Sequence, residues 1–157
     1  GYTFSLPLEE RKLESKKEFL DDIAVMLGGY AAEQLIFNDR TAGASSDLQK
    51  VSAIARAMVT RWGMSDAIGP IAIASDGGRD TGADSRELSE TWKTIVDEEV
   101  QRIAKEALAR AEEVLTAHRT VLDAIAKKLI EVETLEQPEY EAILSAHGIP
   151  LKKIDKK

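Results

Sequence analysis

The chain of 157 residues contains no cysteine. Without thiols it can form neither a disulfide framework nor a thiolate zinc site, so any bound metal must take oxygen or histidine nitrogen atoms. Aromatic residues contribute only 5% of the sequence, whereas apolar residues together contribute 43%. The core must therefore be built mainly from Ala, Leu, Ile and Val, a composition that favours helices packed against helices.

Basic residues are outnumbered, because 21 Lys and Arg stand against 28 Asp and Glu and give a net charge of −7. Binding in a nucleic-acid groove requires a basic face, so we expect no nucleic-acid partner. No apolar run approaches the roughly 18–20 residues that cross a bilayer, and the first residues do not resemble a signal peptide. We expect the chain as given to be soluble. Its start at a glycine, inside a predicted strand, suggests a piece of a longer protein.

Several motifs that would carry chemistry are absent from the sequence, namely H-E-x-x-H, G-x-S-x-G and G-x-x-x-x-G-K. The two histidines, His118 and His147, fall at predicted helix ends without an acid or second histidine at ligand spacing. We interpret both as structural or solvated. Neighbouring acidic pairs such as Glu98 and Glu99 are predicted to lie on solvated helix surfaces. The residues alone therefore indicate no catalytic and no cofactor-binding residue.

The first predicted helix begins at Ser15, which with Glu18 has the spacing of a capping box. Apolar residues then recur every three or four positions as far as Leu35, which predicts one continuous helix. Gly28 and Gly29 lie inside this helix at a cost of about 1 kcal/mol each. We therefore expect a tight contact there, at which another backbone approaches the helix.

A second helix is predicted to be capped by Ser45 or Ser46 and to end near Trp62, with Gly63 as a left-handed C-cap. Its inner stripe is predicted to comprise Leu48, Val51, Ala55, Met58 and Trp62. Residues 63–84 form the longest irregular stretch and exceed the usual loop length of about 4–6 residues. This stretch is predicted to be a mobile loop.

The remaining elements are also predicted to be helical. Ser85 is predicted to cap the longest helix, which runs to His118, and a further helix follows closely. A last short helix beyond Pro138 completes a helical hairpin. Residues 1–157 are thus predicted to form one domain, whose parts are 1–62, the loop 63–84, the C-terminal helical part 85–148 and the charged tail 149–157.

Asp47 lies in the first turn of the second predicted helix, where an acidic side chain stabilises the helix dipole by about 0.3–1 kcal/mol. Its surroundings, Thr41-Ala42-Gly43-Ala44-Ser45-Ser46-Asp47-Leu48, resemble the peptidase motif of the FtsH-type ATP-dependent zinc metalloproteases. Residues 54–60 and 63–65 are similar to the same motif. The resemblance implies that Asp47 is the third zinc ligand.

The resemblance extends from Gly1 to about Leu144, through motifs that occur in the order of the family. They include Gly1-Tyr2-Thr3 with Leu6-Pro7, then Leu27-Gly28-Gly29, Ala31-Ala32-Glu33, Gly69-Pro70, Val96-Asp97-Glu98-Glu99-Val100, His118-Arg119 and Glu133-Thr134-Leu135. Tyr30, Ser46 and Trp62 stand where arginine, asparagine and tyrosine are common. The fold implied is mainly α, the helical bundle of the FtsH-like peptidase domain with a short N-terminal strand remnant.

In this family the H-E-x-x-H helix precedes the Gly-Tyr-Thr strand, so two histidine ligands and the catalytic glutamate are expected outside this chain. The chain alone is expected to be inactive and to hold zinc weakly. The resemblance implies a longer, membrane-anchored homo-hexamer with missing N-terminal segments in the membrane, ATP bound in an upstream ATPase domain, and unfolded or membrane proteins as substrates. Its protease domain would face the bacterial cytoplasm or an organelle interior.

Two other interpretations remain open at this point. The first is a natural relative that has lost the zinc helix and serves as a non-catalytic scaffold or oligomerisation module. The second is an unrelated helical interaction domain. The sequence upstream of Gly1 distinguishes them, because an intact H-E-x-x-H, a degraded helix or neither would be found there.

Overall fold

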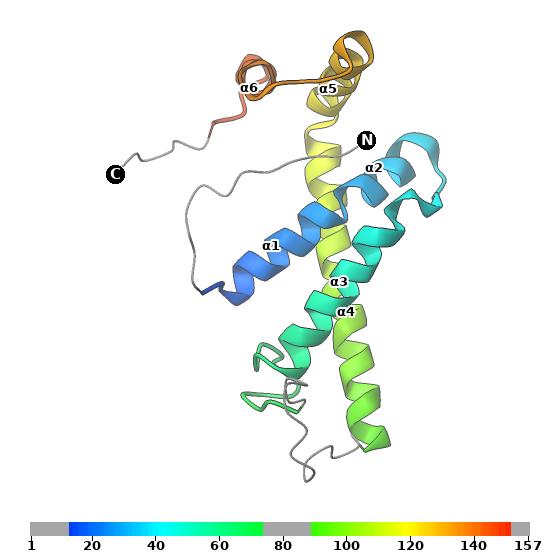
Figure 1. Ribbon diagram of the computed structural model, residues 1–157, viewed down its shortest axis with the longest axis vertical. Helices are drawn as coiled ribbons and strands as arrows, with labels where there is room; N and C mark the ends of the chain where they lie inside the picture. Colours follow the sequence, from blue (N-terminus) through cyan, green and yellow to red (C-terminus); the bar gives the residue numbers. More distant parts are fainter. Residues whose placement is uncertain (1–12, 74–88, 152–157) are drawn as a thin grey trace. The chain divides into compact units, whose positions relative to one another are not determined.

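The computed structural model describes residues 13–73 and 89–151, and every regular element in these ranges is helical (Figure 1). The fold is therefore mainly α, as predicted, whereas the predicted strand at Tyr2–Leu6 lies outside the described residues. The elements are α1 (Lys16–Met26), α2 (Gly28–Phe37), the 3₁₀ helix η1 (Ala42–Ala44), α3 (Ser45–Thr60), α4 (Glu90–Ala117), α5 (Arg119–Val132) and α6 (Gln137–Ala146). None of these helices is long and apolar enough to cross a bilayer.

Helix α1 begins as predicted, with a reciprocal capping box between Ser15 and Glu18. The prediction of one continuous helix is wrong, because the helix is interrupted at Leu27 and resumes as α2. The two glycines that follow Leu27 disfavour an unbroken helix. A side chain built at Gly28 or Gly29 would meet nothing within 4 Å. The expected close approach of another backbone is therefore not found among the described residues, and the glycines coincide with a break instead.

Helix α3 starts at Ser45, but neither Ser45 nor Ser46 is its N-cap, because Ala44 occupies that position and η1 precedes it. Thr41 provides the side-chain cap one turn earlier. At the other end, Gly63 adopts a left-handed conformation with φ of 61°, as predicted. Val51, Ala55 and Met58 of the predicted inner stripe are buried, whereas its end members are partly exposed, Leu48 to 39% and Trp62 to 44%.

Residues 61–73 follow α3 without regular secondary structure, and residues 74–84 of the predicted loop lie outside the described ranges. Ser85, the predicted cap of the longest helix, also lies outside them. In the structure the backbone N–H of Trp92 donates to Ser89 Oγ, so Ser89 makes the hydrogen bond expected of an N-cap at the start of α4.

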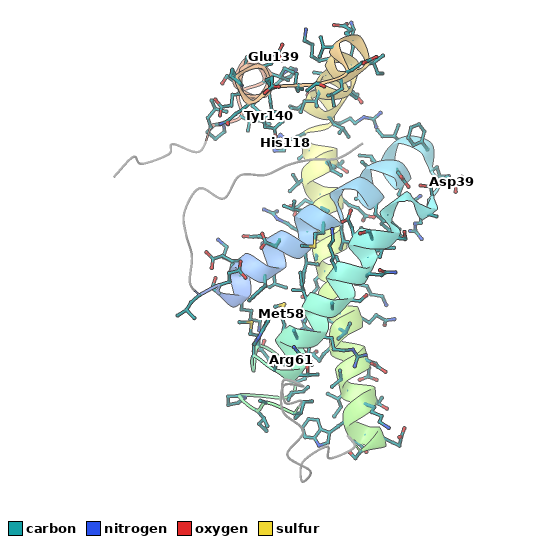
Figure 2. The ribbon with its side chains drawn as sticks, in the orientation of Figure 1. Asp39, Met58, Arg61, His118, Glu139 and Tyr140 are labelled. Atoms are coloured by element: carbon teal, nitrogen blue, oxygen red, sulfur yellow. The ribbon has the colours of Figure 1, made fainter. Side chains whose placement is uncertain are left out.

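The chain divides into two compact units, and the boundary between Val114 and Leu115 falls in the last turn of α4. In the first unit, Glu14–Val114, the helices α1, α3 and α4 enclose one core, to which residues 61–73 contribute Ile68. Met58 of α3 points into this core and is fully buried (Figure 2). The buried members are Ile23, Leu27, Val51, Ala55, Met58, Val59, Ile68, Val96, Ile103 and Ala107.

The second unit contains the hairpin of α5 and α6, which the sequence predicted. Val121 is the one buried residue of α5, and α6 has none. Ile130 is 83% exposed. This pair of helices therefore has little core of its own, in contrast to the unit that holds α1, α3 and α4.

Candidate functional site

Asp47 lies in the first turn of α3, which is where the sequence predicted it. Its side chain is 46% exposed, and Lys50 Nζ one turn later lies 3.2 Å from Asp47 Oδ1. No side chain makes an N-cap hydrogen bond to α3. Asp47, the acidic residue of its first turn, makes the favourable interaction with the helix dipole. The carboxylate is thus accessible, and it is held at a defined place by the helix that carries it.

The turn before α3 is fixed by Glu33 of α2. The backbone N–H of Thr41 donates to Glu33 Oε2 at 3.0 Å, and Thr41 Oγ1 donates to Glu33 Oε1 at 3.0 Å. Thr41 Oγ1 in turn accepts the N–H of Gly43 at 3.1 Å. We call these contacts the Glu33–Thr41 clamp. It connects α2 to the turn before α3 and so helps to fix the position of Asp47.

Gly43 lies close against this clamp. A Cβ at Gly43 would lie 3.1 Å from Thr41 Oγ1 and 3.6 Å from Glu33 Oε1. A larger residue would therefore push against the hydroxyl that caps η1. Across the same turn, which includes Asp39 (Figure 2), the Arg40 guanidinium lies 5.0 Å from the centre of the Tyr30 ring. Tyr30, one of the three departures from the family pattern, thus has a defined partner in this chain.

The described residues do not by themselves make a metal site. Within 13–73 and 89–151, no group of three or more His, Cys, Asp or Glu side chains is placed to hold an ion. A catalytic zinc ion normally takes three protein ligands and one water. Asp47 supplies at most one of these three, so zinc does not fit the described residues alone. The role of Asp47 as a zinc ligand therefore stays a prediction.

The two histidines are both exposed at helix ends. His118 stands between α4 and α5, where its carbonyl accepts the N–H groups of Val121 and Leu122 (Figure 2). His147 ends α6, and its Nδ1 lies 2.8 Å from the carbonyl oxygen of Ile143. Both positions are those predicted from the sequence.

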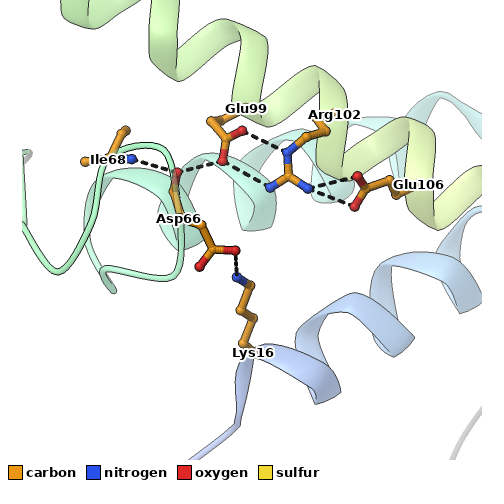
Figure 3. Close-up of polar contacts among 7 residues, drawn as sticks. Lys16, Asp66, Ile68, Glu99, Arg102 and Glu106 are labelled. Carbon is orange, nitrogen blue, oxygen red and sulfur yellow. Dashed lines mark hydrogen bonds and ion pairs between the residues drawn. The ribbon is translucent and has the colours of Figure 1, made fainter.

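Glu99 differs from the prediction of a solvated acidic pair. Glu98 is exposed, but Glu99 is only 8% exposed and lies beside the core. Arg102 donates to it from Nε at 2.8 Å and from Nη2 at 3.0 Å, and Ser65 Oγ donates at 2.6 Å (Figure 3). These partners stabilise the ionised carboxylate against the cost of burial.

The electrostatics of this group follow from its partners. Hydrogen bonds from Arg102 lower the pKa of the Glu99 carboxyl, and Ser65 and the charge of Lys16 act in the same direction against desolvation. Hydrogen bonds to Glu99 and Glu106 raise the pKa of Arg102 in return. The sequence did contain an indication that Glu99 is buried. Glu99 lies seven residues after Trp92 and four before Ile103, on the inward-facing apolar stripe of α4.

Comparison with known proteins settles the family. The model of peptidase family M41 matches residues 1–143, which is nearly the whole chain. The chain belongs to peptidase family M41. An ATP-dependent zinc metalloprotease FtsH of Methylococcus capsulatus is 39% identical over 151 residues, which cover 92% of this chain and 23% of that protein. Membership of M41 excludes the interpretation as an unrelated helical interaction domain.

Two further relatives of this M41 chain have similar names and similar coverage. An ATP-dependent zinc metalloprotease FtsH 3 of Synechocystis is 40% identical, with 96% of this chain and 26% of that protein covered. An ATP-dependent zinc metalloprotease FtsH of Pseudothermotoga lettingae is 42% identical, with 92% and 24% covered. The chain thus spans about a quarter of the length of the curated relatives it matches.

Proposed function

We propose that this chain is part of the peptidase domain of an ATP-dependent zinc metalloendopeptidase. The observation that supports this most directly is the M41 match over residues 1–143, because it includes the Thr41–Leu48 motif. The names of the relatives, which are zinc metalloproteases, agree with it. The carboxylate of Asp47 is accessible, and the Glu33–Thr41 clamp fixes the turn before it, which is consistent with a preorganised metal ligand.

Asp47 is proposed to supply one zinc ligand, and the other two ligands and the base are proposed to come from an H-E-x-x-H helix of the longer protein. Zinc bound in that way would polarise a peptide carbonyl and lower the pKa of its water. The 157-residue chain contains no H-E-x-x-H. On its own it should therefore bind zinc poorly and fail to cleave casein, even with added zinc and ATP.

The wider properties belong to the longer protein and form part of the same proposal. They are a membrane anchor in N-terminal segments, an ATPase domain that binds ATP, assembly as a homo-hexamer and degradation of unfolded or membrane proteins. The protease domain would face the bacterial cytoplasm or an organelle interior. Their basis is the resemblance of this chain to FtsH-type proteases, and the names of its relatives support only the dependence on ATP.

Asp47→Asn in the longer protein tests the proposal. Asparagine keeps the size of the side chain, so the free energy of unfolding should fall by no more than about 1 kcal/mol, the value of a dipole interaction. Zinc content and proteolysis should both fall more than about tenfold, because an anionic ligand is lost. ATP hydrolysis should persist. Zinc content by mass spectrometry, casein degradation, ATPase rate and melting temperature are measured on the same preparation.

Asp39→Asn is the matched control, because Asp39 is an exposed aspartate in the turn between α2 and η1. It should leave zinc content and proteolysis unchanged. If Asp47→Asn also retains both and shifts only the melting temperature, Asp47 serves the helix dipole and the proposed ligand role is wrong. If the longer protein contains no zinc even without a substitution, the result would instead favour the interpretation as a non-catalytic scaffold.

A further inference from the structure

Residues 61–73, which we call the strap, connect three helices of the first unit. The N–H of Ile73 donates to the carbonyl of Thr60 at 2.8 Å, which returns the strap to the end of α3. Trp62 stacks on Phe19 of α1 at 4.5 Å between ring centres. Ser65 Oγ donates to Glu99 of α4. The strap is therefore attached to α1, α3 and α4, although it has no regular structure of its own.

Ser65 is the polar centre of the strap. Its side chain is almost fully buried, and its hydroxyl both donates to Glu99 Oε2 at 2.6 Å and accepts the N–H of Ile68 at 3.3 Å (Figure 3). The carbonyl of Ser65 also accepts the N–H of Gly69 at 2.9 Å. One residue thus closes the turn at residues 65–69 and joins it to α4.

The other attachments of the strap are weaker. Lys16 and Asp66 form an ion pair at 2.9 Å, but the Asp66 side chain is 91% exposed, and exposed pairs contribute little. Trp62 is 44% exposed, Ile68 is the buried core member of the strap, and Met64 and Ile73 pack against the core while only partly buried. Segments with few buried apolar contacts open locally at lower cost than the helices around them. Of the two polar contacts with α1 and α4, the bond between Ser65 and Glu99 is the buried one.

We propose that the strap is a locally opening segment and that the Ser65–Glu99 hydrogen bond is the latch that keeps it closed on α4. The latch is strong while Glu99 is ionised, because a charged acceptor strengthens the hydrogen bond from a hydroxyl. Loss of that charge releases the strap, while the helices of the core stay folded. The charged groups that act on Glu99 are Arg102 of α4 and Lys16 of α1, and each has a second acidic partner, Glu106 for Arg102 and Asp66 of the strap for Lys16.

This proposal is separate from the proposed function. Asp47 lies in the first turn of α3 and the strap begins at Arg61, 14 residues later, which is about 21 Å along the helix at 1.5 Å per residue. Opening of the strap does not remove the Glu33–Thr41 clamp or the carboxylate at the start of α3. A failure of the latch experiment therefore leaves the zinc proposal untouched, and the reverse also holds.

Hydrogen exchange in the 157-residue chain tests the latch through Ser65→Ala and Glu99→Gln. The first removes the hydroxyl, and the second keeps the size of the side chain but removes its charge. Strap amides should exchange about tenfold faster or more in both variants, as expected when a local opening becomes easier. Amides inside α3 and α4 should still exchange more slowly than the strap amides in both variants, because they need a larger opening. The reporting amides are those of Met64, Gly69 and Ile73, whose acceptors are backbone carbonyls that neither variant removes.

Two matched controls accompany these variants. Ser52→Ala removes an exposed hydroxyl that bonds only within α3, and Glu98→Gln neutralises the exposed neighbour of Glu99. Both should leave exchange of the strap unchanged. A strap that exchanges at the same rate as the slowest amides of α1, α3 and α4, in the unmodified chain and in both variants, would overturn the proposal, because the strap would then open only together with the whole core. Unchanged strap exchange in Ser65→Ala or in Glu99→Gln would overturn it as well.

A second measurement needs neither latch variant and covers the case in which Ser65→Ala does not fold. Trp92→Phe leaves Trp62 as the only tryptophan of the chain. Acrylamide quenching of Trp62 should then rise on acidification, at a pH above that at which helical circular dichroism is lost. If the quenching of Trp62 and the helical circular dichroism change at the same pH, local opening of the strap would be contradicted.

Discussion

Glu99 shows that the environment of a side chain depends on which face of the helix carries it. Glu98 and Glu99 are neighbours of the same type, yet one is exposed and the other lies beside the core with Arg102 and Ser65 as partners. No buried side-chain nitrogen or oxygen in the described ranges lacks a hydrogen-bond partner. Burial of this carboxylate is therefore compatible with a stable fold.

The sign of the pH dependence of Glu99 follows from its partners. Its pKa in the folded chain lies below the ordinary glutamate value, so folding favours the ionised form. That stabilisation is complete above the unfolded pKa, about 4.3, and is lost as the pH falls through the lower folded value. Glu99→Gln should therefore lower the free energy of unfolding by about 1–3 kcal/mol near pH 7, since charged hydrogen bonds are lost.

Urea unfolding between pH 7 and pH 3 measures this difference. The difference in the free energy of unfolding between the unmodified chain and Glu99→Gln should be constant down to about pH 5. It should become smaller as the pH falls below the ordinary glutamate pKa. Glu98→Gln, the exposed counterpart, should show almost no gap at any pH. A gap for Glu99→Gln that widens in acid would mean that the sign is wrong.

At the scale of elements, the Glu33–Thr41 clamp is the connection that places α3 relative to α2. Glu33→Ala should destabilise the chain by about 1–2 kcal/mol, because two hydrogen bonds to a carboxylate are lost at the turn. Glu33→Gln keeps one acceptor oxygen and should have a smaller effect. Thermal unfolding gives the differences, and Glu112→Ala, at an exposed position of α4, is the control. An effect no larger than that of the control would show that the turn does not need the clamp.

Local patterns predicted the helices better than their joints. Apolar spacing identified every long helix, and the capping box placed the start of α1 correctly. The break at Leu27 was missed, because a stripe of apolar residues continues through it and only the glycines marked it. The cap of α3 was also missed, since Thr41 acts through η1, and Glu33 reaches it from a preceding helix. Contacts between elements leave no regular period in the sequence.

The candidate site shows the same limit. The position of Asp47 in a first turn followed from local sequence, and its proposed role came from a family motif rather than from spacing of ligands. Ser65 and Glu99 are 34 residues apart in the chain. Such a pair becomes visible only after α4 has packed beside α3, so the sequence alone could suggest the buried face for Glu99 but not its partner.

At the scale of the whole molecule, the core and the C-terminal hairpin are distinct. Every residue of the main core precedes α5, and the first unit ends at Val114. Removal of residues 119–157 should therefore change the melting temperature of the remaining chain by less than about 5 °C, the equivalent of roughly 1 kcal/mol. Circular dichroism should show a cooperative transition and loss only of the helix contributed by α5 and α6.

The opposite deletion provides the control for that prediction. A chain that retains residues 115–157 alone has one buried residue in α5 and none in α6, so it should show little stable helix. A fall of more than about 10 °C in the first deletion would show that the hairpin supports the core, contrary to the division into two units.

The open surface at Gly29 makes this chain well suited to spin labelling. Nothing lies within 4 Å of a Cβ added at Gly29, and the 157-residue chain has no thiol of its own. Gly29→Cys would therefore introduce a unique attachment point for a nitroxide on α2, without displacing a neighbour. The spectrum of such a label sharpens when it tumbles freely and broadens when a neighbouring segment restricts it. In a longer protein with any cysteines outside these 157 residues replaced, the line shape at this one position would report directly whether another helix covers the glycine face.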